Sequence, residues 1–307
     1  MELSAIFQPK EILAPYDYSE PSNLALKYAC VGARIYGARL TVLHAHSLDL
    51  PPYFTEGDQE RLLAEIEAAK RNARDHLARR VGRILDLAQC GPQVSFEVAD
   101  THPVDAILEA AERHRAELIV LGTHGRGGAK RLLLGSVTEN VVRQSPAPVF
   151  VVRQKQHEII DPADPSKMPT IRNVLCPVNE MAVSRRAVGH AAAVAARFGA
   201  ALTLLHVVED GAASEESSRE RFGPWIEECK SADVCATLKI RHGKAADGII
   251  DYARETNQDL IVTGARLRDA GGPLFGSTTE TLLRRAPAPV FVVPGGTERP
   301  EAVPPAG

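Results

Sequence analysis

Hydrophobic residues in the first half of the chain switch repeatedly between short apolar runs and runs with a three-to-four-residue period. Short apolar runs are typical of buried strands, and the longer period is typical of helices packed on one side. Strands are predicted at Glu11–Pro15, Leu40–His46, Val94–Ala99, Leu118–Leu121 and Val149–Val152. Strand and helix therefore alternate along the whole half.

Capping signals place the helices between these strands. Ser19-Glu20-Pro21 is a favourable helix start with proline near the first turn, and Gly37 is a favourable residue just past the end. Helices are further predicted at Asp58–Ala88, at Val104–His114 and directly after Ser136. Asp58–Ala88 is long, charged and amphipathic, with apolar positions at Leu62, Leu63, Ile66, Leu77, Val81 and Leu85.

The second half of the chain repeats the first. The segment that starts at Ile12 aligns without a gap with the segment that starts at Val174, and AELIVLG, ending at Gly122, matches QDLIVTG, ending at Gly264. GSVTENVVRQSPAPVFVV from Gly135 matches GSTTETLLRRAPAPVFVV from Gly276. Because the order and spacing agree apart from a shorter middle, two tandem copies of one fold are expected.

Alternating strands and helices predict right-handed crossovers and a parallel sheet covered by helices on both faces. The fold class is therefore α/β, with two doubly wound Rossmann-like domains at residues 1–153 and 171–294. The polar, proline-containing stretch 154–170 is interpreted as a linker, and 295–307 as a loose tail.

Composition narrows the classes of partner and location. The 307 residues carry a net charge of −3 and a sequence pI of about 6.4, which gives no basic field for nucleic acid. No apolar run approaches the length that spans a bilayer, so no membrane partner is expected. The odd number of cysteines and the lack of a C-x-x-C pair favour reduced thiols and a cytoplasmic location; the cysteines are Cys30, Cys90, Cys176, Cys229 and Cys235.

A glycine-rich stretch, GTHGRGGAKRLLLGSV, runs from Gly122 to Val137 between a predicted strand and a helix. Gly122 and Gly125 would allow close backbone approach to a phosphate and a positive φ. Ser136 would cap the following helix or donate its hydroxyl to phosphate, because helix starts attract anions. Mobile positive charge is expected from three further side chains, Arg126, Lys130 and Arg131.

The stretch does not fit the common phosphate-binding motifs. No Lys-Ser/Thr pair follows the glycines, as a Walker A loop needs, and Lys130 stands where G-x-G-x-x-G needs its last glycine. Its G-x2-G-x9-G-S pattern after a strand instead resembles the universal stress protein family. Asp17 after the first strand, the Leu-His run of the second strand and the PAPVFVV strand resemble that family too, over nearly both halves.

The resemblance implies five-stranded parallel sheets of order 3-2-1-4-5 that bind ATP, with the last strands pairing the domains. Pairing through Val149–Val152 and Val290–Val293 would make the two halves a pseudo-dimer within the chain and cover edges that invite aggregation. It implies that Pro15, Tyr16, Asp17 and Ala45 surround adenine, with the Asp17 carboxylate accepting from the base or ribose. Ribose and phosphate contacts would come from Leu121, Gly122, His124 and Gly125. The phosphate end would be held by Gly135, Ser136, Val137 and Thr138. Mg²⁺ would bridge phosphate oxygens without a protein ligand.

The second half departs from this pattern. Asn179 replaces Asp17, Leu267 replaces Gly125, and Asp269 stands where the first half has Gly127. The loop from Gly264 to Gly276 is also one residue shorter. Bulk and negative charge oppose phosphate binding, so one strong site per chain is expected, although Gly276-Ser277 is retained.

Structural interpretations compete with the functional ones. An isolated Gly-x-x-Gly is most often a tight turn, and Asp17 is as compatible with a turn as with a ligand contact. His44 and His46 share a strand face, but packing or hydrogen bonding is favoured over a metal pair because no Cys or carboxylate completes a ligand set. The charged face of Asp58–Ala88 is interpreted as solvated, with docking of a partner as the alternative. Cys229 and Cys235 are interpreted as structural.

Three functions are compared. The leading hypothesis is a cytoplasmic stress-response protein that binds ATP in its first domain and changes conformation or protein partner, with at most slow hydrolysis or autophosphorylation on Ser136 or Thr138. The second is a nucleotide-dependent transferase or pyrophosphatase, which would need an S-G-G-x-D-S loop where PYDYSEPS stands. The third is a scaffold that binds no nucleotide. No catalytic residue is assigned, and a homodimer is left open.

Overall fold

A computed structural model describes residues 7–45, 56–123, 134–153, 159–209, 214–265 and 276–295. The first half contains β1 (Glu11–Pro15), α1 (Glu20–Tyr36), β2 (Arg39–Ala45), α2 (Glu56–Gly82), the short 3₁₀ helix η2 (Leu87–Gln89), β3 (Val94–Ala99), α3 (Pro103–Arg113), β4 (Leu118–Gly122), α4 (Ser136–Gln144) and β5 (Val149–Val152). The second half contains β6 (Asn173–Pro177), α5 (Ala182–Phe198), β7 (Ala201–Val208), α6 (Glu215–Ser231), β8 (Ala236–His242), α7 (Ala245–Glu255), β9 (Leu260–Ala265), α8 (Ser277–Arg285) and β10 (Val290–Pro294).

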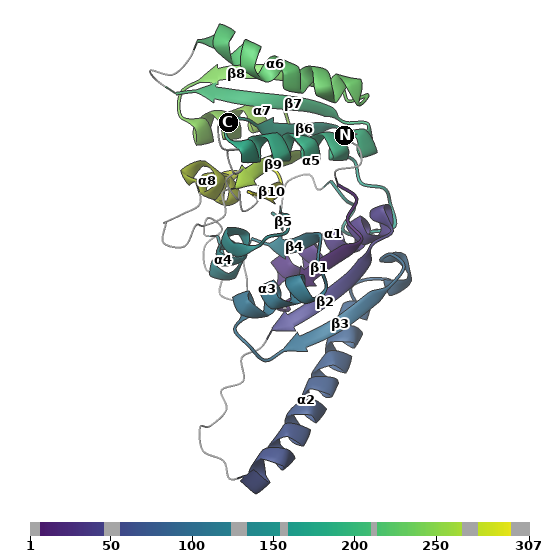
Figure 1. Cartoon of the computed structure of the whole chain (residues 1–307). Coiled ribbons are helices and arrows are strands. Elements are labelled where there is room, and N and C mark those ends of the chain that lie inside the picture. Colours follow the sequence, from purple (N-terminus) through teal and green to yellow (C-terminus); the bar gives the residue numbers. More distant parts are fainter. Residues whose placement is uncertain are drawn as a thin grey trace, which may run out of the picture.

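The strands form one continuous sheet of ten, in the order β3-β2-β1-β4-β5-β10-β9-β6-β7-β8 (Figure 1). Each half contributes a parallel sheet of order 3-2-1-4-5, which confirms the expected topology. The halves join where β5 and β10 pair antiparallel, with Phe150 opposite Phe291. The expected pairing of the last strands is therefore confirmed, and the protein is a pseudo-dimer built on that junction.

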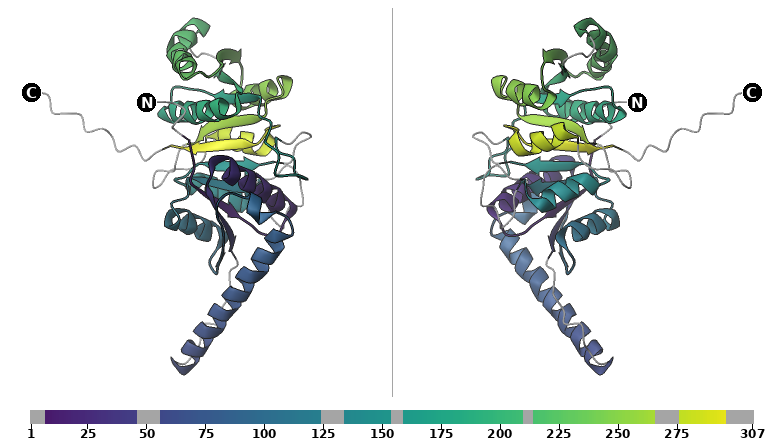
Figure 2. Two further views of the ribbon diagram at one scale, coloured as in Figure 1. Left: turned by 90° about the vertical axis from the view of Figure 1, so that its right-hand side faces the viewer. Right: turned by 90° about the vertical axis from the view of Figure 1, so that its left-hand side faces the viewer.

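Helices cover both faces of the sheet (Figure 2). One face carries α1, the end of α2, α5 and α6, and its buried residues include Leu26, Leu77 and Phe222. The other face carries α3, α4, α7 and α8, with Ile107, Val141 and Ile250 among its buried residues. Strand residues alternate between these two apolar layers, as a parallel sheet buried on both sides requires.

The predicted caps of α1 are confirmed. Ser19 is the N-cap and its Oγ accepts from the N–H of Ser22, while Gly37 ends the helix with a φ of 63°. Gly199 ends α5 in the same way, also at 63°. A glycine is suited to these two positions because a left-handed backbone strains residues that carry a Cβ.

The long helix differs from its prediction at its C-terminal end. Asp58–Ala88 was expected to be one helix, but α2 ends at Gly82 and η2 follows after a turn. Asp86 explains the break, because its Oδ1 accepts from the N–H of Ala88 and starts η2. Leu77, Val81 and Leu85 are buried as predicted. The earlier part of α2 extends away from the sheet as an arm (Figure 1).

Cys30 of α1 and Cys90 after η2 form a disulfide, so the expectation of reduced thiols throughout is wrong. The two residues are 60 positions apart, and only the packing of η2 against α1 brings them together. Gly91 permits that approach, since a Cβ on it would lie 2.6 Å from the carbonyl oxygen of Ala38. Cys176 and Cys229 are free and buried, and burial raises the pKa of Cys229 to about 11. The free Cys235 is exposed.

Candidate functional site

Several of the predicted site residues lie where three neighbouring strands end. β1 pairs with β4, and β2 lies on the other side of β1, so the ends of these three strands are adjacent. Pro15 and Ala45 are half-buried at the ends of β1 and β2, and Leu121 and Gly122 are buried at the end of β4. In a doubly wound sheet this is the switch point, where a crevice opens between diverging connections.

Two hydrogen bonds pin the base of the glycine-rich loop. The N–H of Gly135 donates to the carbonyl oxygen of Thr123 at 2.8 Å, and Oγ1 of Thr138 donates to the carbonyl oxygen of Gly122 at 2.7 Å. These bonds hold the start of α4 against the end of β4. The intervening His124, Gly125, Arg126, Lys130 and Arg131 lie outside the described residues.

Gly122 is required by packing, not by a positive φ. A Cβ on Gly122 would lie 2.7 Å from the carbonyl oxygen of Pro21, in the first turn of α1. Its φ is not among the left-handed glycine values of the described residues, so the expected conformational reason is wrong for Gly122. The glycine lets α1 cross close above the strand end.

Asp17 starts α1 through a turn. Its Oδ1 accepts from the Ser19 N–H at 3.1 Å and from the Ser19 hydroxyl at 2.6 Å. The interpretation as a turn residue is thus confirmed for one carboxylate oxygen, and the side chain is half-buried at the strand end. This turn fixes the carboxylate beside the crevice, which a ligand contact also needs.

Tyr16 points away from the crevice. Its hydroxyl donates to Oδ1 of Asn23 on α1 at 2.7 Å, and the side chain is buried in the α1 layer. Burial, the largest cause, raises the pKa of Tyr16 above its ordinary value. Only the backbone of Tyr16 therefore faces the strand end, where its carbonyl oxygen is also bonded.

His44 is a packing residue, as favoured over a metal pair. Its Nδ1 donates to the carbonyl oxygen of Tyr16 at 2.8 Å, and it is buried. His206 makes the equivalent bond to Val178 at 2.9 Å. His46 lies outside the described residues, and within the described part of the chain no three His, Cys, Asp or Glu side chains form a metal-sized group.

Tyr18 is a neighbour of the site that the sequence did not indicate. Its φ is 67°, a left-handed value that is unusual for a bulky residue. Its ring contacts those of Tyr16, His44 and His76 at centroid distances of 5.0, 4.7 and 6.0 Å. The contact with His76 places the base of α2 beside the Asp17 turn. A positive φ at a single non-glycine residue cannot be recognised from the sequence pattern.

Gly135 is the N-cap of α4, and no side chain in the described parts of the chain caps this helix. The expected capping by Ser136 is therefore wrong, because Ser136 is the first helical residue and is exposed. Val137 is half-buried against the α3–α4 apolar layer, together with Ala45. The first turn of α4 thus presents peptide N–H groups beside a half-buried apolar side chain.

Comparison with known proteins shows which family shares this arrangement. The model of the universal stress protein family matches residues 9–153 and again 170–294. The chain belongs to the universal stress protein family. A family protein of Thermus aquaticus is 39% identical over 146 residues, which is 47% of this chain and 98% of that protein.

Tandem universal stress proteins match along almost the whole chain. One of Mycobacterium tuberculosis is 29% identical over 307 residues, covering 92% of this chain and 96% of that protein. The crystal structure of a universal stress protein from Archaeoglobus fulgidus superposes with a TM-score of 0.70 at 26% identity, covering 94% of this chain and all of that one. The two-copy architecture is therefore shared with other universal stress proteins.

The second universal stress protein domain keeps the loop base but changes the site. Oγ1 of Thr279 donates to the Gly264 carbonyl oxygen at 3.2 Å, and a Cβ on Gly264 would lie 2.7 Å from Val183. Asn179 takes the place of Asp17. Leu267 and Asp269 lie outside the described residues, so their expected effect stays a prediction.

No described helix has the length and apolar content that crossing a bilayer requires.

Proposed function

We propose that the first domain binds ATP at the crevice between the ends of β1 and β4. The observation that carries the proposal is the start of α4, which no side chain of the described residues caps and which the Gly135–Thr123 hydrogen bond holds at the switch point. Helix starts present N–H groups and a partial positive charge to anions. A phosphate group is the anion that this position suits.

The adenine end of the proposed site is formed by Pro15, the Tyr16 backbone, Asp17 and Ala45. Ala45 and Val137 supply a half-buried apolar floor for the base, and the Asp17 carboxylate supplies an acceptor for a base amino group or ribose hydroxyl. The donor-poor, apolar floor and the single acceptor fit adenine with its sugar.

The phosphate end of the proposed site uses Leu121, Gly122, His124, Gly125, Gly135, Ser136, Val137 and Thr138. Thr138 acts through its backbone, because its hydroxyl is buried and donates to Gly122. Ser136 is exposed at the first turn and supplies the hydroxyl. Mg²⁺ is proposed to bridge phosphate oxygens, with charge neutralisation as its contribution.

The proposed activity is regulation by occupancy, in a stress response in the cytoplasm. Asp17 accepts from Ser19, so its role is orientation, and neither it nor the buried Thr138 is arranged to activate a nucleophile. The proposed reactions of ATP are limited to slow hydrolysis and to phosphorylation of Ser136. The proposal includes a protein partner that senses whether the nucleotide site is occupied. It also includes a homodimer of the whole chain.

Calorimetric titration with MgATP tests the site. Wild type is compared with Asp17→Asn and Gly135→Ala, and the second domain supplies the matched controls Asn179→Asp and Gly276→Ala. A Cβ on Gly276 meets nothing within 4 Å, so that control is structurally mild. Affinity lost in the first pair and kept in the second supports the assignment. Equal affinity in all five proteins contradicts it.

Two further measurements separate the alternatives. Mass spectrometry of small molecules released from the purified, denatured protein identifies an adenine compound if the protein binds nucleotide, and none if it is a scaffold. An ATP turnover assay on the same preparation then distinguishes a binding protein from a transferase or pyrophosphatase.

A further inference from the structure

A cavity of about 80 Å³ lies between the two halves, on the α1–α5 face of the sheet. Its lining pairs equivalent residues of the two domains, because it lies where the pseudo-twofold axis passes the β5–β10 junction. The pairs are Tyr36 with Phe198, Leu118 with Leu260, and Phe150 with Phe291.

One lining pair breaks this symmetry. Gly32 of α1 aligns with Val194 of α5, and both line the cavity. Val194 is buried, whereas Gly32 has no side chain to fill the equivalent space. A Cβ on Gly32 would meet only Ile12 Cδ1, at 3.5 Å, which is ordinary contact. Nothing in the packing therefore requires glycine at this helix-interior position, where glycine is unfavourable.

The stretch 159–171 covers the cavity and contributes Ile159, Ile160, Pro169 and Ile171 to its lining. The N–H of Thr170 donates to the carbonyl oxygen of Ile159 at 2.8 Å, which closes the base of this cover. The stretch 154–170 was interpreted as a linker. Its described part also packs on the first domain, so it does more than connect the two halves.

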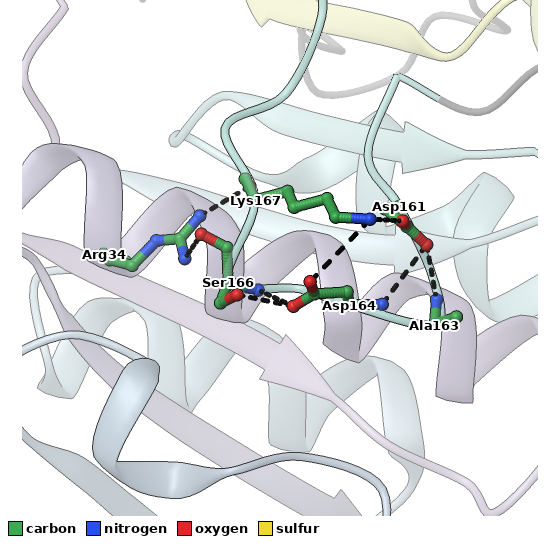
Figure 3. A network of polar contacts seen from close by, with 6 residues as sticks. All are labelled: Arg34, Asp161, Ala163, Asp164, Ser166 and Lys167. Atoms are coloured by element: carbon green, nitrogen blue, oxygen red, sulfur yellow. Dashed lines mark hydrogen bonds and ion pairs between the residues drawn. The ribbon is translucent and has the colours of Figure 1, made fainter.

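Polar contacts attach the cover to α1 (Figure 3). Lys27 Nζ donates to the carbonyl oxygen of Pro162 at 2.7 Å, and the Arg34 guanidinium donates to the carbonyl oxygens of Ser166 and Lys167. Within the cover, Lys167 Nζ pairs with Asp161 at 2.7 Å. These polar groups bond on the outer side of the cover, and the apolar side chains are left to line the cavity.

The chemistry of the lining selects the occupant. The walls are nearly all carbon, so a water inside would lack the two to four polar partners that hold buried water. Tyr36 is neutral at physiological pH even at its ordinary pKa, and burial raises that pKa further, to about 12. Dry cavities on the order of 150 Å³ lined by aliphatic and aromatic side chains take up benzene or xenon.

We propose that this cavity binds a compact, neutral apolar species smaller than benzene, such as xenon, because its volume is about half that of cavities known to take up benzene, and that Gly32 opens the space for it. The walls formed by Phe150, Phe291 and Tyr36 supply close dispersion contacts to such an occupant. The site lies on the junction of the halves, so its occupant contacts both domains. It is separate from the crevice at the strand ends.

Xenon titration of the full chain tests the proposal, followed by xenon-129 NMR and by the rise in melting temperature under xenon pressure. Wild type is expected to bind one xenon atom per chain. Gly32→Val, which installs the residue of the second half, is expected to weaken binding at least tenfold. Gly223→Val on α6 is the matched control, because a Cβ there meets nothing within 4 Å, and its affinity is expected to stay within twofold of wild type.

Additional variants keep the test decisive. If circular dichroism shows that Gly32→Val does not fold, Gly32→Ala replaces it and is expected to weaken binding at least threefold. Val194→Ala enlarges the cavity and is expected to allow benzene to bind. No saturable xenon binding in wild type, or equal xenon binding in the Gly32 variants, overturns the proposal. ATP affinity is measured separately, so the two proposals fail independently.

Discussion

Asp17 and Asn179 occupy equivalent positions in the two domains and make equivalent turns. Oδ1 of each accepts from the N–H two residues later, at 3.1 Å in both, and from a serine hydroxyl at 2.6 Å. The hydroxyl belongs to Ser19 in the first domain and to Ser184 in the second. The two sites therefore differ in charge at this position, and they also differ in the backbone of the next residue, since Tyr18 has a φ of 67° and Glu180 is not among the described residues with a positive φ.

Asp17→Asn is predicted to lower ATP affinity about tenfold, or about 1.4 kcal/mol, because it removes a charged acceptor and keeps the turn. The free energy of unfolding should change by less than about 0.5 kcal/mol. Calorimetry and urea unfolding measure the two quantities. A large loss of stability with unchanged affinity would show that Asp17 serves only the turn.

Gly122→Ala is predicted to destabilise the first domain by about 1–3 kcal/mol, since its Cβ would lie 2.7 Å from the Pro21 carbonyl oxygen. Urea unfolding measures the change. Gly276→Ala is the control, with no atom within 4 Å of the added Cβ, and should change stability little. Equal stability of the two variants would contradict the close approach of α1 to β4.

Reduction of the Cys30–Cys90 disulfide is predicted to lower the free energy of unfolding by about 4 kcal/mol, because it closes a loop of 60 residues. The second domain has Ala192 and Ala232 at the equivalent positions, so the double variant Cys30→Ala/Cys90→Ala should fold. Unfolding with and without reductant measures the effect. The double variant should show no response to reductant, and an equal response in both proteins would contradict the bond.

Glu97 is predicted to make stability depend on pH. Burial alone would raise its pKa, but hydrogen bonds from His114 and Arg113 outweigh burial and hold the pKa below its ordinary value. A lowered acid pKa stabilises the fold above the unfolded pKa of about 4.3 and loses this contribution as pH falls through the folded pKa. The stability difference between wild type and Glu97→Gln should shrink between pH 6 and pH 3. A constant difference would contradict this role.

Much of the fold follows from the sequence because it depends on local signals. Ser19, Pro21 and Gly37 mark the limits of α1, and the apolar runs give β1, β3 and β5 with their observed bounds. The repeat, read with the family resemblance, also predicted that β5 and β10 would meet. Such features depend on residues close together in the sequence or on matching of whole segments.

Features that depend on packing between distant residues were not predictable. The Cys30–Cys90 bond needs η2 to pack on α1, and the role of Gly122 needs Pro21 to lie above it. The hydrogen bond from the Thr138 hydroxyl to the Gly122 carbonyl oxygen is also a tertiary contact. In each case the residue type allowed several roles, and only the partner decided between them.

The stoichiometry of MgATP binding, measured by equilibrium titration of the full chain, decides whether the first domain alone binds the nucleotide tightly. One tight site per chain is expected, lost in Gly135→Ala and kept in Gly276→Ala. Two equal tight sites, or no saturable binding to the wild-type chain, would contradict this expectation.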